Sequence, residues 1–253
     1  MTPLFAALFV AFLMMAGALA GALLRKHLPS KHFGQETMEA VKLGLGFIAT
    51  LSALVMGLVI SSSKASYDAR VEMVHASAAL IIQFDASLRQ IGPEADPIRV
   101  VLKDAVVATM GEIWGAHSLE VDQPEAVVTK RRVGQLERML FALVVSNEMQ
   151  RQAQANAFKL VAELARLNAS AFTQHGSDVV MPLLAVVSCW MMLNVAGWNL
   201  FAPANRMLMA VNVVCALSVA SAVFLILEMD QPFNGVISIS EVPMRAALER
   251  LLE

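Results

Sequence analysis

Charged side chains are scarce in this sequence. Asp, Glu, Lys and Arg make up 16% of the 253 residues, whereas hydrophobic residues make up 57%. A soluble globular domain carries more charge than this. The scarcity excludes an ordinary soluble protein and indicates that a lipid bilayer is the natural solvent of the chain.

The sequence also lacks an excess of charge of one sign, since 19 Lys and Arg stand against 21 Asp and Glu. A nucleic-acid-binding protein needs a basic surface, so no nucleic-acid partner is expected. Cysteine is limited to Cys189 and Cys215, which both lie inside apolar runs. Such cysteines behave as small hydrophobic residues, and no disulfide framework is indicated.

Four uncharged apolar runs are each long enough to cross a bilayer as a helix. We predict spans at about residues 4–24, 43–63, 179–201 and 207–227. The first run could instead be a signal peptide, because residues 18–20 resemble a small-residue cleavage site. No basic residue precedes that run, which favours a retained helix.

These spans divide the chain into four parts. They are a first transmembrane hairpin (1–63), an extramembrane domain (64–177), a second transmembrane hairpin (178–228) and a tail (229–253). Apolar residues recur three and four apart in the extramembrane domain, which predicts helices. The sequence therefore predicts an all-α integral membrane protein with a two-plus-two span order and a helical bundle between the second and third spans.

The bundle is expected to contain four helices. The first continues the second span to about Gln90, and the next two cover about residues 97–117 and 125–145. Ser146 or Asn147 can cap the fourth, which leads toward the third span.

The tail is expected to hold two elements. The β-branched run at residues 236–240 predicts a short strand-like segment. Ser240 can then cap an amphipathic helix with Pro243 in its first turn. The apolar face of this helix consists of Leu248, Leu251 and Leu252. We expect it to pack on the bundle or on a neighbouring subunit.

Residues that could form a catalytic or metal-binding set are not evident. His75, His117 and His175 lack partners at metal-ligand spacing and are predicted to be structural or solvated. The basic run at residues 130–132 is predicted to be a solvated helix face. Neither a metal, a cofactor nor an enzymatic activity is therefore expected.

The second span carries one face of small residues, spaced three or four apart. These are Gly46, Thr50, Ala53, Gly57 and Ser61, while Leu45, Ile48, Leu51, Val55 and Leu58 cover the other side. Such a face fits tight packing against another span or a symmetry mate. If copies of the span surround an axis, it could instead line a narrow pore.

The other spans contribute few polar groups. Asn212 and Ser218 of the fourth span could complete either arrangement, and just beyond it Glu228 and Asp230 place two carboxylates at the membrane exit. A ring of such acids in an oligomer would attract cations, although the acids could simply mark the lipid boundary. The polar residues of the spans are expected to form interhelical hydrogen bonds rather than to serve permeation. They are Thr50, Ser52, Ser188, Asn194, Asn199, Asn212, Ser218 and Ser221.

Basic residues give a weak indication of orientation. Arg25 and Lys26 follow the first span, and no basic residue precedes it. Because basic residues are enriched in cytoplasmic loops, this slightly favours a cytoplasmic location for the short loops between spans. This places the extramembrane domain on the periplasmic side.

Three stretches of the sequence resemble the bestrophin-like family of bacterial multi-spanning membrane proteins. They are residues 41–70, 201–205 and 227–235, and an Ile-Ser run follows the last of them. Together with the span order, the resemblance covers nearly the whole chain. It implies an oligomeric channel with a helical extramembrane region, since bestrophins are oligomeric anion channels. A calcium-binding run of acids is not evident here, and acids at the exit fit anion passage poorly.

We therefore expect a homo-oligomeric ion channel or pore of a bacterial inner membrane, with lipid and inorganic ions as partners. The alternative is a membrane-anchored sensing or scaffolding protein whose helical bundle binds a partner.

Overall fold

The computed structural model describes residues 2–27, 34–115, 125–173, 177–202, 205–231, 233 and 235–253, with the backbone alone at 125–131, 170–173 and 177–180. Every regular element in these ranges is a helix, which confirms the all-α prediction. The elements are α1 (Pro3–His27), α2 (Gln35–Ile91), the 3-10 turn η2 (Pro93–Ala95), α3 (Asp96–Trp114), α4 (Glu125–Ala142), α5 (Glu148–Thr173), α6 (Ser177–Phe201), α7 (Arg206–Asp230) and α8 (Val242–Leu252).

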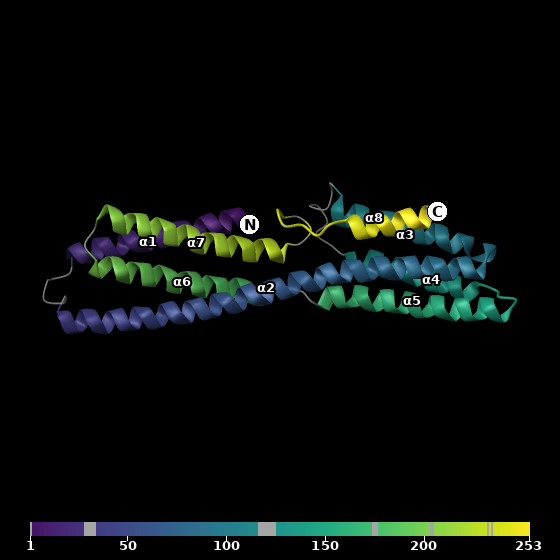
Figure 1. The fold of residues 1–253 in the computed structure, drawn as a ribbon, viewed down its shortest axis with the longest axis horizontal. Helices are drawn as coiled ribbons and strands as arrows, with labels where there is room; N and C mark the ends of the chain where they lie inside the picture. The colour runs from purple at the N-terminus through teal and green to yellow at the C-terminus, as the bar shows by residue number, and fades with distance from the viewer. Residues whose placement is uncertain are drawn as a thin grey trace. The chain divides into compact units, whose positions relative to one another are not determined.

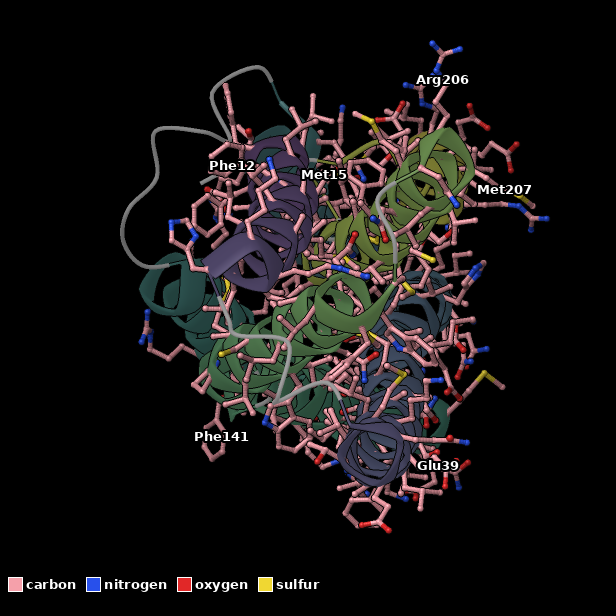
Figure 2. All side chains as sticks on the ribbon, turned by 90° about the vertical axis from the view of Figure 1, so that its left-hand side faces the viewer. Phe12, Met15, Glu39, Phe141, Arg206 and Met207 are labelled. Atoms are coloured by element: carbon pink, nitrogen blue, oxygen red, sulfur yellow. The ribbon has the colours of Figure 1, made fainter. Side chains whose placement is uncertain are left out.

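Within the described ranges, four helices are long and apolar enough to cross a membrane. They are α1, α2, the Met181–Phe201 part of α6, and α7. Many large apolar side chains of these helices are exposed, including Phe12 and Met207, which point away from the neighbouring helices in Figure 2. Apolar groups that face outward on span-length helices are suited to contact with lipid.

The second span continues well beyond membrane length, as predicted. Helix α2 runs without interruption to Ile91, and Figure 1 shows it as the longest ribbon of the chain. It ends because Gly92 adopts a positive φ of 108° and donates its N–H to the carbonyl of Leu88 at 3.2 Å. Glycine tolerates this conformation, and Pro93 cannot continue the helix.

The chain forms two compact units that share α2. The first unit contains residues 1–66 and 176–230. In it, α1 packs against α6 and α7, and the core includes Val10, Met56, Val187 and Ile226 from α1, α2, α6 and α7.

Glycine allows α1 and α6 to approach closely. A Cβ atom built on Gly21 would lie 2.1 Å from the carbonyl oxygen of Ala196, and one on Gly17 would lie 2.7 Å from that of Met192. Small residues at such a crossing let two backbones touch, which favours helix association in lipid.

The second unit contains residues 67–175 and 231–253. The C-terminal part of α2, with α3, α4, α5 and α8, surrounds a core that includes Phe84, Leu102, Leu140 and Val161. Asn147 is the residue that caps α5, because its Oδ1 accepts the N–H of Gln150 at 2.8 Å. Of Ser146 and Asn147, the cap is therefore Asn147.

The tail differs from the prediction in two respects. Residues 236–240 form no strand, because a strand requires a partner strand to bond its backbone and none is present among the described residues. Helix α8 buries Met244, Ala247 and Leu251, whereas Leu252 is 60% exposed. The helix does pack on the bundle, against α3.

The basic run is also not a fully solvated face. Arg132 is partly buried and pairs with Glu112 of α3, with Nη2 2.7 Å from Oε1 and Nη1 3.3 Å from Oε2. A planar guanidinium matches a carboxylate in this two-point geometry, so Arg132 joins α4 to α3. The side chains of Lys130 and Arg131 lie outside the described residues.

Candidate pore surface on the second span

The small face of α2 lies open within the subunit. Gly46, Thr50, Ala53, Gly57 and Ser61 are all exposed. A Cβ atom on Gly46 or Gly57 would meet nothing within 4 Å, and the Thr50 hydroxyl donates to the Gly46 carbonyl of its own helix at 2.9 Å. Packing against the described part of the same chain therefore does not account for this face.

The buried side of α2 lies elsewhere on the helix. Leu45, Ser52, Met56 and Val59 form it, at the spacing of one helical face. Ser52 is fully buried and donates to the Ile48 carbonyl at 2.8 Å. Of the large residues expected opposite the small face, Leu58 is instead 63% exposed. The span thus has a packed side, a small open side and a large apolar open side.

The two candidate residues of α7 lie in different surroundings. Asn212 is buried and forms a reciprocal amide pair with Asn199 of α6, in which Nδ2 of Asn212 lies 2.9 Å from Oδ1 of Asn199 and the return bond is 3.3 Å. Ser218 is exposed and donates to the Val214 carbonyl of its own helix at 2.8 Å. Asn212 is therefore engaged between α6 and α7.

The membrane-exit acids lie at the C-terminal end of α7. The side chain of Glu228 is buried, and Asp230 is partly exposed. Both residues interact with other groups of the chain.

Asn194 holds α2 against α6, a role that the sequence did not single out. Its Nδ2 donates to the backbone carbonyl of Leu45 at 2.7 Å, and its Oδ1 accepts the indole N–H of Trp198 at 2.9 Å. Interhelical bonding had been expected of Asn194 in general terms. The four-residue spacing to Trp198 was the available signal, since it places both side chains on one helical face.

Several titratable groups outside the spans form ion pairs. Glu163 and Arg166 of α5 pair on the surface, and the hydrogen bond from Arg166 lowers the pKa of the Glu163 carboxyl. His75 is exposed, while His117 and His175 lie outside the described residues. Among the residues that the structure describes, no three His, Cys, Asp or Glu side chains are grouped as a metal site requires.

The comparisons with known proteins agree with this fold. The bestrophin-like domain family matches residues 12–244. One variant of a bacterial bestrophin homologue from Klebsiella pneumoniae is 14% identical, with a TM-score of 0.69 and coverage of 100% of this chain and 97% of that one. Another variant is 13% identical, with a TM-score of 0.63 and coverage of 94% and 97%.

A solved structure described as a membrane protein is 12% identical, with a TM-score of 0.66 and coverage of 99% of this chain and 97% of that one. At these identities the structures support the fold alone. No curated protein sequence matches the chain. Because the family match spans nearly the whole sequence, this membrane protein belongs to the bestrophin-like family.

Proposed function

We propose that the chain is one subunit of a homo-oligomeric ion channel or pore. The observation that carries the proposal is the small face of α2, which is exposed and uncharged and has no packing partner among the described residues of the subunit. In an oligomer whose copies of α2 surround an axis, Gly46, Thr50, Ala53 and Gly57 would line the ion pathway, with Ser61 at its end. Membership of the bestrophin-like family supports this arrangement.

The chemistry of the face suits passive permeation. Gly and Ala leave the backbone close to the axis, and the Thr50 hydroxyl adds a polar group that water can contact. The predicted spans contain no Asp, Glu, Lys, Arg or His, so the ionisable relay that a proton-coupled carrier requires is missing from them. Conduction through a wetted constriction needs no such relay.

Recording currents from the purified chain in planar bilayers tests the proposal. The intact protein should give discrete ionic currents. A matched variant, Thr50→Leu, should reduce the current because it fills the small face with an apolar side chain, whereas Leu58→Ile on the large apolar open side should leave the current unchanged. Silence across inorganic ions and voltages would refute the channel.

A second candidate function is supported by the continuity of α2. Because one helix belongs to both units, a partner bound to the bundle could pass a conformational change to the membrane, as in a sensing or scaffolding protein. Purification under mild conditions distinguishes the two functions. Recovery of one stoichiometric partner, together with absence of current, would favour the sensing or scaffolding protein.

We further propose a bacterial inner-membrane location with the bundle on the periplasmic side, on the basis of the basic residues around the first hairpin. The test is a reporter that is active only in the cytoplasm, fused to the C-terminus. We expect no reporter activity there, and activity would show that the orientation is the reverse.

A further inference from the structure

Helices α2 and α6 are joined by a polar contact in the first unit. Asn194 is 7% exposed, and its side-chain amide lies between the Leu45 carbonyl of α2 and the Trp198 indole of its own helix. The Leu45 carbonyl is already part of the α2 helix, but a carbonyl oxygen has two lone pairs and can accept a second hydrogen bond. The contact therefore adds to the helix without breaking it.

Chemistry fixes the orientation of this amide. A backbone carbonyl can only accept a hydrogen bond, and an indole N–H can only donate one. The NH₂ group of Asn194 must therefore face α2, and its oxygen must face Trp198. Because both ends of the amide are engaged, the side chain has one arrangement that satisfies all three groups.

The packing beside this contact is equally specific. A Cβ atom on Gly197 would lie 2.6 Å from Cδ2 of Leu45, so the missing side chain of Gly197 leaves the room that Leu45 occupies. Leu45 is itself buried, at 8% exposure. Asn194 and Gly197 thus hold one residue of α2 by its backbone and by its side chain.

Leu45 directly precedes the first residue of the small face. Successive residues of an α-helix are rotated by about 100°, so a helix held at Leu45 has a fixed direction for Gly46 and for the residues one and two turns beyond it. The buried residues Ser52, Met56 and Val59 repeat the direction of Leu45. The rotation of α2 therefore decides whether the small face or its large apolar face meets the axis of an oligomer.

We propose that Asn194 is a positioning residue that sets the rotation of α2 and thereby selects the face that lines the ion pathway. This inference rests on the proposed function, because the face matters only if it lines a pathway. The Asn199–Asn212 pair joins α6 to α7 and provides a matched control, since it is a buried amide contact between spans that leaves α2 untouched.

The test measures the rotation of α2 in the full chain, reconstituted in liposomes. Cys189 and Cys215 are exposed and are first replaced by Ala. Single cysteines are then introduced along α2 and labelled with a nitroxide, whose collision rate with oxygen varies around the helix. The labelled positions are Thr50, Ala53, Leu54, Gly57 and Leu58. The same cysteines are also treated with a charged thiol reagent that reacts only where water reaches them.

The expected result is a shift in the position along α2 at which the nitroxide collides most often with oxygen. Asn194→Leu should move the oxygen-collision maximum by about one residue, which corresponds to a rotation of roughly 100°. It should also slow the reaction of the charged reagent with Ala53→Cys by about tenfold. Asn212→Leu should leave both patterns in place. Trp198→Phe, which keeps Asn194 but frees its oxygen, should give a smaller shift in the same direction and serves if Asn194→Leu fails to fold.

An unchanged pattern in both Asn194→Leu and Trp198→Phe would overturn the inference, and so would an equal shift in Asn212→Leu. If the small-face cysteines never react with the charged reagent while Asn194→Leu still moves the oxygen pattern, Asn194 positions α2 but the small face does not line a wet pathway. That outcome overturns the proposed function and the selection of a pore face, and leaves only the role in helix rotation.

Discussion

Asp85 shows how a single buried carboxylate organises the second unit. It lies near the end of α2, where its two oxygens accept hydrogen bonds from the Nε atoms of Arg89 and Arg99, each at 2.7 Å. Arg89 also donates through Nη2 to the backbone carbonyl of Arg250 in α8, at 2.9 Å. Asp85 thus holds two guanidinium groups that connect α2 with α3 and α8.

Replacing Asp85 with Asn should destabilise the protein, because the neutral amide loses both ion pairs and keeps only one of the two oxygens that accept from the arginines. Breaking a buried pair costs up to 5 kcal/mol, and the partial exposure of both arginines reduces this to about 2 kcal/mol. In a chain of this size we expect Tm to fall by roughly 4–8 °C. Thermal unfolding of the variant in detergent measures this fall in Tm.

The control for Asp85 is Glu163→Gln, which removes one partner of a surface pair and should leave Tm unchanged. Equal Tm values for the Asp85 variant and the unchanged protein would show that the cluster is not structural.

Glycines of the spans should respond to substitution in opposite ways. Gly21→Ala places a Cβ atom against the Ala196 backbone, which cannot move aside, so α1 must separate from α6 at a cost of about 1–3 kcal/mol. The Cβ atom of Gly57→Ala meets no described atom within 4 Å, so this change should not lower subunit stability. Denaturation of both variants in detergent checks this, and equal stability would contradict the close α1–α6 crossing.

Residue spacing was enough to predict the small face, because its members recur with the helical period. Spacing could not predict which polar residue of the spans bonds to which partner. Asn194 and Asn212 look alike in sequence, yet one bonds to a backbone carbonyl of α2 and the other to an amide of α6. That difference depends on helix rotation, which is set by the packing of several helices together.

At the scale of elements, local sequence signals are enough to predict where α2 ends and α5 begins, but not the structure of the tail. The end of α2 follows from Gly92 and Pro93, and the start of α5 follows from its Asn147 cap. The tail was harder to predict. A β-branched run forms a strand only beside another strand, and the chain presents helices there, so tertiary structure overrides propensity.

Trp114 links the tail to α3. Its indole N–H donates to the Ile239 carbonyl at 2.8 Å, and its ring meets that of Phe233 edge to face, with centroids 5.8 Å apart. Helix α8 has only 11 residues, which is too short for a stable isolated helix. Its order therefore depends on these contacts and on its buried apolar face.

Trp114→Ala should release the tail, because it removes both the hydrogen bond and the ring contact. We expect limited proteolysis to cut between α7 and α8 at least about tenfold faster, since cleavage follows the population of the open form. Trp114→Phe, which can keep the ring contact, should give an intermediate rate. A rate unchanged by Trp114→Ala would mean that the core contacts of α8 hold the tail without Trp114.

At the scale of the whole molecule, two compact units are connected through α2, which carries the candidate pore surface in one unit and the Asp85 cluster in the other. Hydropathy and periodicity were enough to predict this helix. They could not show which faces stay open within a subunit, because that depends on the packing of α1, α6 and α7. The exposed small face is therefore the main contribution of the structure to the functional proposal.

The central claim, that this small face lines an ion pathway, is tested most directly by single-channel recording with a charged thiol reagent. The cysteine-free chain carrying Thr50→Cys is incorporated into a planar bilayer, and Leu58→Cys serves as the control on the large apolar open side. We expect an ionic current that the reagent sharply reduces in the Thr50 variant and leaves unchanged in the Leu58 variant. No current from the parent chain, or an equal effect of the reagent on both variants, would contradict it.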